Sequence, residues 1–150
     1  LLTLLNQRMG IVFDVGKIKN ASKEGVYRPE REKAIIDRLC EESKGKLDIK
    51  TIRPIFQEIF AASRNIEFLE TISYLGPEGS FTHQAAENNF GSTSNYLALN
   101  SIKAVFNSIE TKKTKYGIIP LENNQEGVVQ ETIDILGKSN LLLLQNFPCQ

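Results

Sequence analysis

The sequence contains no tryptophan, one histidine and only two cysteines in 150 residues. Cys40 and Cys149 form neither a CxxC pair nor a metal-binding spacing, so we expect no metal site and a reduced, cytoplasmic setting. Neither charge sign is in excess, because 18 Lys and Arg residues balance 18 Asp and Glu residues. This balance argues against nucleic acid or an anionic membrane surface as a partner.

Long hydrophobic runs are also missing. The run Leu141–Leu144, which is as long as any in the sequence, is far too short to span a bilayer. The N-terminus is apolar, but Arg8 interrupts it and no small-residue cleavage site follows, so we expect no signal peptide. What remains is an ordinary globular composition, with 41% hydrophobic and 24% charged residues.

The first twenty residues follow a helical period, and two cations lie on the apolar side. One narrow stripe contains Leu1, Leu5, Arg8, Val12, Val15 and Lys19. A second apolar line of Leu4, Ile11 and Ile18 widens the face that we expect to be buried. Arg8 and Lys19 are about 16 Å apart along such a helix, which leaves room for a small anion between them. The alternative is that both cations pair with acids on neighbouring helices or extend to the rim of the core.

Two more helices are expected before residue 70. One begins at Pro29, a position that tolerates proline, and the next is capped by Asp48 or Thr51. The third helix carries Ser63 and Glu67 on its apolar arc. Ser63 equally suits a close helix crossing, and the alternative for Glu67 is that the helix has reached solvent at this point. Three such helices bury too little surface alone, so we predict an all-α domain of the intertwined dimer type.

The second half alternates short strands with helices, which predicts an α/β domain with a mainly parallel sheet. The expected strands are Ile72–Leu75, Tyr96–Leu99, Tyr116–Pro120 and Leu141–Gln145. The expected helices are Thr82–Phe90, Ser101–Ile109 and Val128–Lys138, the second of them capped by Ser101.

Two loops follow strands of this sheet, where open α/β sheets bind ligands. The loop Gly76–Phe81 leads into a helix, so its backbone N–H groups are candidates to face an anion, but a plain structural turn is the better interpretation. The loop Glu122–Gly127 supplies amide side chains, which are also common in ordinary turns. His83 has no triad partners in the sequence and is interpreted as a helix-surface residue.

Four motifs resemble the all-helical chorismate mutase domain, over about residues 1–68. They are Leu4-Leu5-Asn6-Gln7-Arg8, Val15-Gly16-Lys17-Ile18-Lys19, Tyr27-Arg28-Pro29-Glu30-Arg31-Glu32, and Ile55-Phe56 leading to Ser63 and Glu67. The resemblance implies rearrangement of chorismate, a dianion, to prephenate without a cofactor. Such an enzyme holds the compact conformer of the substrate and stabilises charge on the breaking ether oxygen.

The resemblance also implies a role for each motif residue. Arg8 would bind a substrate carboxylate, Lys19 would donate to the ether oxygen, Arg31 and Glu32 would shape the pocket with Glu32 near the ring hydroxyl, and Ser63 would assist a carboxylate. Glu67 would be a second donor to the ether oxygen, which requires its protonated form.

Two departures from the mutase pattern are visible. Arg28 stands where some members use Asp, so we assign it no catalytic role. The family's first helix starts further upstream and carries an Arg that crosses into the partner's pocket, and that Arg would precede Leu1.

Two further motifs, from Ile72 onward, resemble prephenate dehydratase. They are Tyr74–Thr82 followed by His83-Gln84-Ala85-Ala86, and Tyr116–Asn124 followed by Glu126-Gly127. The resemblance implies a lobe of the periplasmic-binding-protein kind and prephenate-binding roles for Gly79, Ser80, Glu122, Asn123 and Asn124. Asn124 replaces the family's Ser or Thr, and the family's catalytic Thr-Arg motif would lie beyond residue 150.

Together the motifs predict a mutase domain over residues 1–70, truncated at its N-terminus, and the first lobe of a dehydratase domain over residues 71–150, truncated at its C-terminus. That order is typical of the bifunctional enzymes of phenylalanine biosynthesis, which convert chorismate to prephenate and prephenate to phenylpyruvate. We expect a cytoplasmic homodimer. The alternatives are a mutase with a degenerate second domain and a non-catalytic module that binds small anions.

Overall fold

The computed structural model describes residues 1–22, 27–67, 70–123 and 127–144, with the side chains of 19–22 and 123 left out. The chain divides into two compact units. The first contains Leu1–Leu69 and Phe90–Ser94, and the second contains Glu70–Asn89 and Asn95–Gln150.

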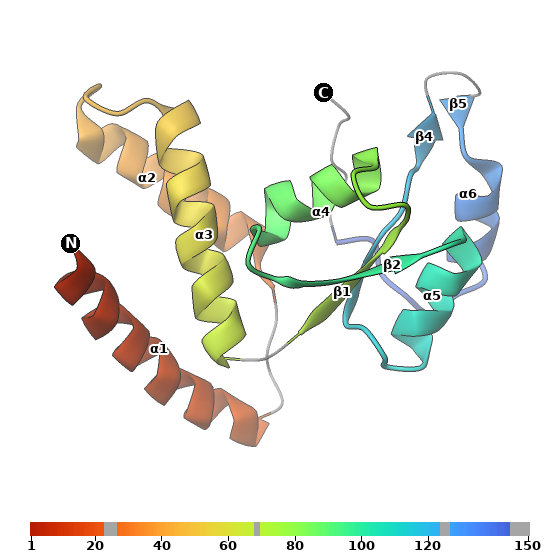
Figure 1. Cartoon of the computed structure of the whole chain (residues 1–150), viewed down its shortest axis with the longest axis horizontal. Coiled ribbons are helices and arrows are strands. Elements are labelled where there is room, and N and C mark those ends of the chain that lie inside the picture. The colour runs from red at the N-terminus through yellow and green to blue at the C-terminus, as the bar shows by residue number, and fades with distance from the viewer. Residues whose placement is uncertain (23–26, 68–69, 124–126, 145–150) are drawn as a thin grey trace. The chain divides into compact units, whose positions relative to one another are not determined.

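The first unit contains three helices, as predicted. They are α1 (Leu2–Ser22), α2 (Pro29–Ser43) and α3 (Ile49–Glu67), and α3 packs against both of the others (Figure 1). Helix α2 begins at Pro29, whose missing N–H costs nothing in the first turn. Asp48 caps α3, because its carboxylate accepts the backbone N–H of Thr51 at 2.9 Å.

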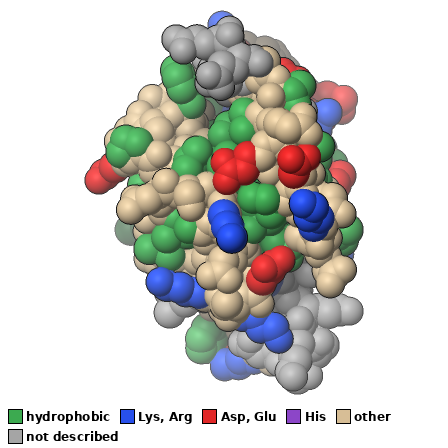
Figure 2. All heavy atoms as spheres, turned by 90° about the vertical axis from the view of Figure 1, so that its right-hand side faces the viewer, with side chains coloured by type: hydrophobic (Ala, Val, Ile, Leu, Met, Phe, Trp, Pro, Cys, Tyr) green, Lys and Arg blue, Asp and Glu red, His purple; other side chains and the backbone are tan. Residues whose placement is uncertain are grey.

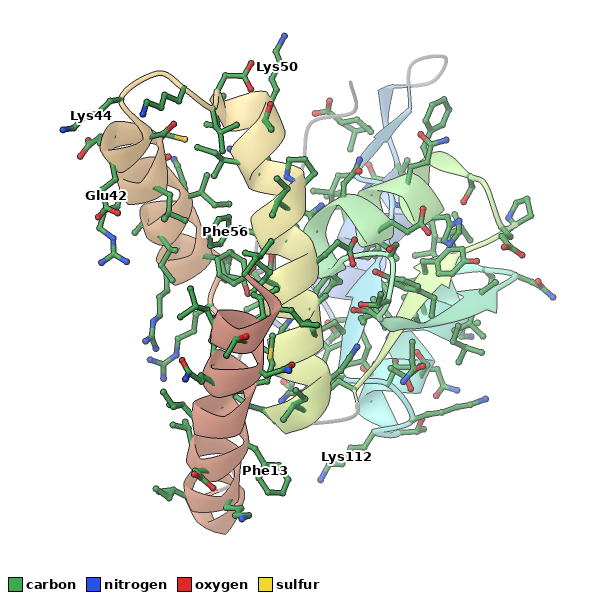
Figure 3. All side chains as sticks on the ribbon, turned by 60° about the vertical axis from the view of Figure 1, so that its left-hand side comes forward. Phe13, Glu42, Lys44, Lys50, Phe56 and Lys112 are labelled. Atoms are coloured by element: carbon green, nitrogen blue, oxygen red, sulfur yellow. The ribbon has the colours of Figure 1, made fainter. Side chains whose placement is uncertain are left out.

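The hydrophobic core of this unit lies between α2 and α3. It contains the buried residues Ile36, Ile52 and Phe60, with Ile35, Leu39, Cys40 and Phe56 packed against them. Figure 3 shows Phe56 directed from α3 toward α2. Its members recur at helical spacing on both segments, so each helix presents one apolar face to the other.

The expected buried face of α1 is partly wrong. The predicted second line is exposed: Leu4, Ile11 and Ile18 have 66%, 67% and 74% of their surface accessible. Leu1 and Val15 of the predicted first stripe are exposed as well, at 94% and 36%. Among the residues of α1 whose side chains are described, 2–18, the buried one is Gly16, at which an added Cβ would lie 3.3 Å from the Cα of Glu67. Because Gly16 has no side chain, α1 approaches α3 closely along this side. Arg8 lies on the same side, half-buried.

The second unit is an α/β structure. Its elements are β1 (Thr71–Leu75), α4 (Phe81–Phe90, whose last residue belongs to the first unit), β2 (Asn95–Leu99), α5 (Ile102–Glu110), β3 (Tyr116–Ile118), β4 (Glu122–Asn123), β5 (Gly127–Val128) and α6 (Gln130–Leu136). Strands β2, β1 and β3 form a parallel sheet in that order, which confirms the predicted class.

The core of the second unit combines apolar residues with a buried hydroxyl cluster. Val105 and Phe106 of α5 and Tyr74 of β1 are buried. The hydroxyls of Ser73 and Ser108 lie 2.9 Å apart, and the Thr114 hydroxyl lies 3.0 and 2.8 Å from them. These mutual hydrogen bonds offset the cost of burying three polar groups.

One predicted strand is absent from the described residues, and two predicted elements are shorter than expected. The segment Leu141–Leu144 is not a strand, while Gln145 lies outside the described residues. A strand needs a neighbouring strand for its backbone hydrogen bonds, and hydrophobicity alone does not supply one. The strand predicted over Tyr116–Pro120 ends at Ile118. Val128 pairs in β5 opposite Glu122, so the helix predicted from Val128 begins at Gln130.

The described surface carries mixed charge. On the face in Figure 2, acidic, basic and hydrophobic side chains are interspersed. Among the described residues, no helix has the length and apolarity that crossing a bilayer requires. The same residues contain no group of three His, Cys, Asp or Glu side chains arranged for a metal ion.

Candidate functional site

Arg8 and Ser63 meet where α1 packs on α3. The Nη1 group of Arg8 donates a hydrogen bond to the Oγ of Ser63, a buried side chain with 8% of its surface exposed. The Ser63 hydroxyl donates in turn to the Ile59 carbonyl at 2.6 Å, so its lone pairs remain available to the guanidinium. The sequence placed a cation on the apolar side of α1, and its neighbour is a neutral hydroxyl rather than an acid.

Glu32 and Arg64 form a second polar contact, between α2 and α3. Nη1 of Arg64 donates to Oε1 of Glu32, and the two side chains are only 18% and 20% exposed. Burial raises the pKa of the Glu32 carboxyl above its ordinary value, while the charge and hydrogen bond of Arg64 act in the opposite direction. The ion pair with Arg64 therefore reduces the free-energy cost of burying an ionised Glu32 carboxylate.

The other predicted mutase residues lie on the same three helices. Glu67 is half-buried beside Gly16, at the close approach of α1 and α3. Arg31 is exposed on α2. The side chain of Lys19, the expected donor to the ether oxygen, lies outside the described residues, although its backbone belongs to α1.

The glycine loop after β1 is held by its own hydrogen bonds. The N–H of Gly79, which has a φ of +81°, donates to Nδ1 of His83 at 3.1 Å, and the N–H of Ser80 donates to the Pro77 carbonyl at 3.1 Å. These two amides are therefore engaged within the loop, which agrees with the interpretation of Gly76–Phe81 as a plain structural turn. The Ser80 hydroxyl donates to the Leu75 carbonyl at 3.1 Å and accepts the His83 N–H at 3.3 Å.

The second predicted loop is partly a hairpin. Glu122 is exposed on β4, and the backbone of Asn123 pairs with Gly127 in β5. The side chain of Asn123 and the whole of Asn124 lie outside the described residues. The structure thus fixes the backbone on each side of this loop.

Two protein-family models match the chain, prephenate dehydratase over residues 72–150 and chorismate mutase type II over residues 1–68. The chain belongs to the prephenate dehydratase family. The resemblance to both families predicted from the motifs is confirmed.

Curated relatives of this prephenate dehydratase family member carry both names. The bifunctional chorismate mutase/prephenate dehydratase of Aquifex aeolicus is 35% identical over 145 residues, which cover 94% of this chain and 40% of that protein. The protein of the same name from Neisseria gonorrhoeae is 37% identical over 141 residues, covering 94% and 38%. The chain therefore spans about 40% of the length of these relatives.

A solved structure of prephenate dehydratase from Streptococcus mutans is 42% identical. It aligns with a TM-score of 0.42 over 45% of this chain and 35% of that chain.

Within the dehydratase-family segment, the interpretation of His83 as a surface residue is wrong. Its side chain is 14% exposed and stacks on Tyr74 with ring centroids 4.8 Å apart. Tyr96 packs edge-on at 5.9 Å. The spacing of four residues between Gly79 and His83 was the available signal, because it lets the imidazole reach back over the first turn of α4.

Within the mutase-type segment, sequence reasoning missed Arg64. It follows Ser63 directly, and a large cation beside a predicted site residue on a helix arc was the available signal. Its pairing with Glu32 joins residues 32 positions apart, so it becomes visible only when α2 and α3 pack together.

Proposed function

We propose that the first unit rearranges chorismate to prephenate. The observation that carries this proposal is the inward contact of Arg8 with the buried Ser63, which holds a half-buried cation between α1 and α3. A dianionic substrate compensates the cost of such a cation. The match of residues 1–68 to chorismate mutase type II supports the same assignment.

Each mutase residue receives a distinct role in this proposal. Arg8, held by Ser63, binds one substrate carboxylate, and Lys19 with protonated Glu67 donates to the breaking ether oxygen. Glu32 accepts a hydrogen bond from the ring hydroxyl, and Arg31 lies at the pocket edge. The reaction is intramolecular, so these groups act by holding the compact conformer and by stabilising charge that develops on oxygen.

The second unit is proposed to act on prephenate, the product of the first reaction, in the protein that contains this chain. Gly79, Ser80, Glu122, Asn123 and Asn124 would line one side of a site for its decarboxylating dehydration to phenylpyruvate. Support comes from the two loops at the carboxyl ends of β1 and β3, the usual ligand edge of parallel sheets. The domain boundary is proposed between residues 70 and 71, just before β1.

We also propose a homodimer built through α1 and a cytoplasmic location. The uncovered apolar line of Leu4, Ile11 and Ile18 supports an intertwined partner helix, because surface leucines and isoleucines in a row are costly in water. The free thiol of Cys40 supports a reducing compartment.

The test is turnover by the purified protein at its natural length. Chorismate consumption is followed by ultraviolet absorbance, and the product is identified as prephenate by mass spectrometry. We expect turnover that is lost in Arg8→Met and retained in Arg53→Met, which changes an exposed arginine on α3. A wild-type protein that leaves chorismate unchanged would exclude the mutase assignment.

The dehydratase assignment is tested separately, with prephenate as the substrate and phenylpyruvate as the measured product. We expect Glu122→Gln to reduce phenylpyruvate formation without changing chorismate turnover. Equal loss of both activities would instead indicate a folding defect.

A further inference from the structure

Arg64 is surrounded on several sides by fixed partners. Its Nη1 pairs with Glu32, and its Nη2 donates to the Phe90 carbonyl at 2.9 Å. Its guanidinium carbon lies 5.3 Å from the ring centroid of Tyr27 and 5.7 Å from that of Phe90. Both rings are buried, and they contact each other with centroids 4.6 Å apart. The aromatic rings and the carbonyl thus restrict the guanidinium to one orientation.

The Phe90 carbonyl is itself held in place by α3. An added Cβ at Gly91, which has a φ of +84°, would lie 2.5 Å from the Cβ of Ala61, so the backbone there is as close to α3 as glycine allows. The Glu58 carboxylate accepts the Ser92 N–H at 2.8 Å. Residues Phe90–Ser94 therefore belong to the first unit, although they lie within the segment matched to prephenate dehydratase.

We propose that Arg64 is a positioning residue of the mutase site, which holds the Glu32 carboxylate ionised and oriented to accept a hydrogen bond from the substrate's ring hydroxyl. This inference rests on the proposed mutase function. The ion pair uses Oε1 of Glu32, so Oε2 is the oxygen that meets the hydroxyl. Without the cation, a half-buried carboxylate would protonate more readily or turn toward solvent.

The test is a double-mutant cycle on chorismate turnover by the protein at its natural length. The variants are Arg64→Met, Arg64→Lys, Glu32→Gln and the double variant Glu32→Gln with Arg64→Met. Arg53→Met is the matched control, because Arg53 is an exposed arginine on the same helix. Circular dichroism and thermal midpoints check that each variant folds.

We expect Arg64→Met to lower kcat/KM about 10- to 100-fold, the range for a lost hydrogen bond to a charged group. Most of the loss should be a rise in KM, because the hydroxyl contact exists in both the ground state and the transition state. In the Glu32→Gln background, the same change should cost less than about twofold, because Arg64 acts through Glu32. Arg64→Lys should restore part of the loss, since it keeps the charge without the planar fork.

Two results would overturn the proposal while the mutase function stands. One is an Arg64→Met enzyme with wild-type KM and kcat, and the other is an equal loss with and without Glu32. If Arg64→Met does not fold, Arg64→Lys in the same cycle decides the question by the same criteria. A wild-type protein with no chorismate turnover would overturn both proposals and is recognised because no variant produces prephenate.

Discussion

At the scale of single residues, the polar groups of the first unit are arranged as pairs. Ser63 accepts from Arg8 and Arg64 donates to Glu32, so two of the proposed substrate-facing groups, Arg8 and Glu32, each have a neighbour that fixes their direction. A long side chain that is already held loses less conformational entropy when a ligand binds. The two pairs therefore reduce the conformational entropy that Arg8 and Glu32 lose when the substrate binds.

Glu67 gives a prediction about hydrogen-bond donors at this scale. A glutamine amide always has a donor, whereas a methionine side chain of similar length has none. We expect Glu67→Gln to keep or raise mutase kcat/KM and Glu67→Met to lower it. The measurement is chorismate turnover, and equal activity of the two variants would exclude residue 67 as a donor.

Residue identities were predicted from the sequence more readily than residue partners. The inward cation at Arg8 and the polar position at Ser63 follow from helical spacing, because each falls on an apolar arc. Their hydrogen bond depends on how two helices pack, and spacing within one segment carries no information about that. Arg64 and His83 were missed for the same reason, since their partners are Glu32 in another helix and Tyr74 in a strand.

At the scale of elements, substitutions at two glycines of α1 distinguish the effect of helix propensity on stability from the effect of helix packing. An added Cβ at Gly10 would meet no atom within 4 Å, whereas one at Gly16 would lie 3.3 Å from the Cα of Glu67. We expect Gly10→Ala to stabilise the protein by about 0.5–1 kcal/mol through helix propensity. We expect Gly16→Ala to destabilise it by about 1–3 kcal/mol, because α1 must move away from α3.

Urea unfolding measures both free energies of unfolding. If Gly16→Ala stabilised the protein as much as Gly10→Ala does, the close approach of α1 and α3 would be excluded.

The cap of α3 gives a prediction about acid stability. Hydrogen bonds from the hydroxyl and the backbone N–H of Thr51 lower the pKa of the Asp48 carboxyl. A carboxyl whose pKa is lowered by folding stabilises the protein above its unfolded-state pKa, and this contribution is lost as pH falls through the folded-state value. We expect Asp48→Asn to reduce the difference between the thermal midpoints at neutral pH and at about pH 3, below the ordinary pKa of Asp.

Thr51→Val serves as the intermediate case for this cap, because it removes the hydroxyl and keeps the backbone N–H. Its thermal midpoints should show a pH difference between those of the wild type and Asp48→Asn. An unchanged difference in both variants would exclude the cap as the source of acid sensitivity.

Predicted elements failed where a neighbouring segment decided the outcome. The third helix and the helix capped by Ser101 were predicted well, because cap and period are local signals, and Asp48 is one of the two caps predicted for the third helix. The hydrophobic run at Leu141 was predicted as a strand, but the described Leu141–Leu144 has no strand pairing. The buried face of α1 was predicted wrongly, because α1 packs on α3 through Gly16, which has no side chain, and not through the line of leucine and isoleucine residues.

At the scale of the whole molecule, the proposed dimer is testable through the uncovered line on α1. Ile11 is central in that line, and a charge there would be buried against the partner helix. We expect Ile11→Glu to give a monomer in sedimentation velocity and to reduce mutase activity. Ile133→Glu on α6, also an exposed isoleucine, is the matched control and should keep the wild-type assembly state. A dimeric Ile11→Glu protein would exclude α1 as the interface.

Ser63 and Arg64 are adjacent on one helix, and this adjacency limits how the site can vary. Consecutive helical positions project about 100° apart, so Ser63 contacts Arg8 on α1 while the next residue, Arg64, contacts Glu32 on α2. A single peptide unit thus sets the separation between Ser63, which holds the cation Arg8, and Arg64, which holds the anion Glu32. Lengthening or shortening either interhelical connection would leave that separation unchanged, whereas inserting one residue into α3 between them would misalign both at once.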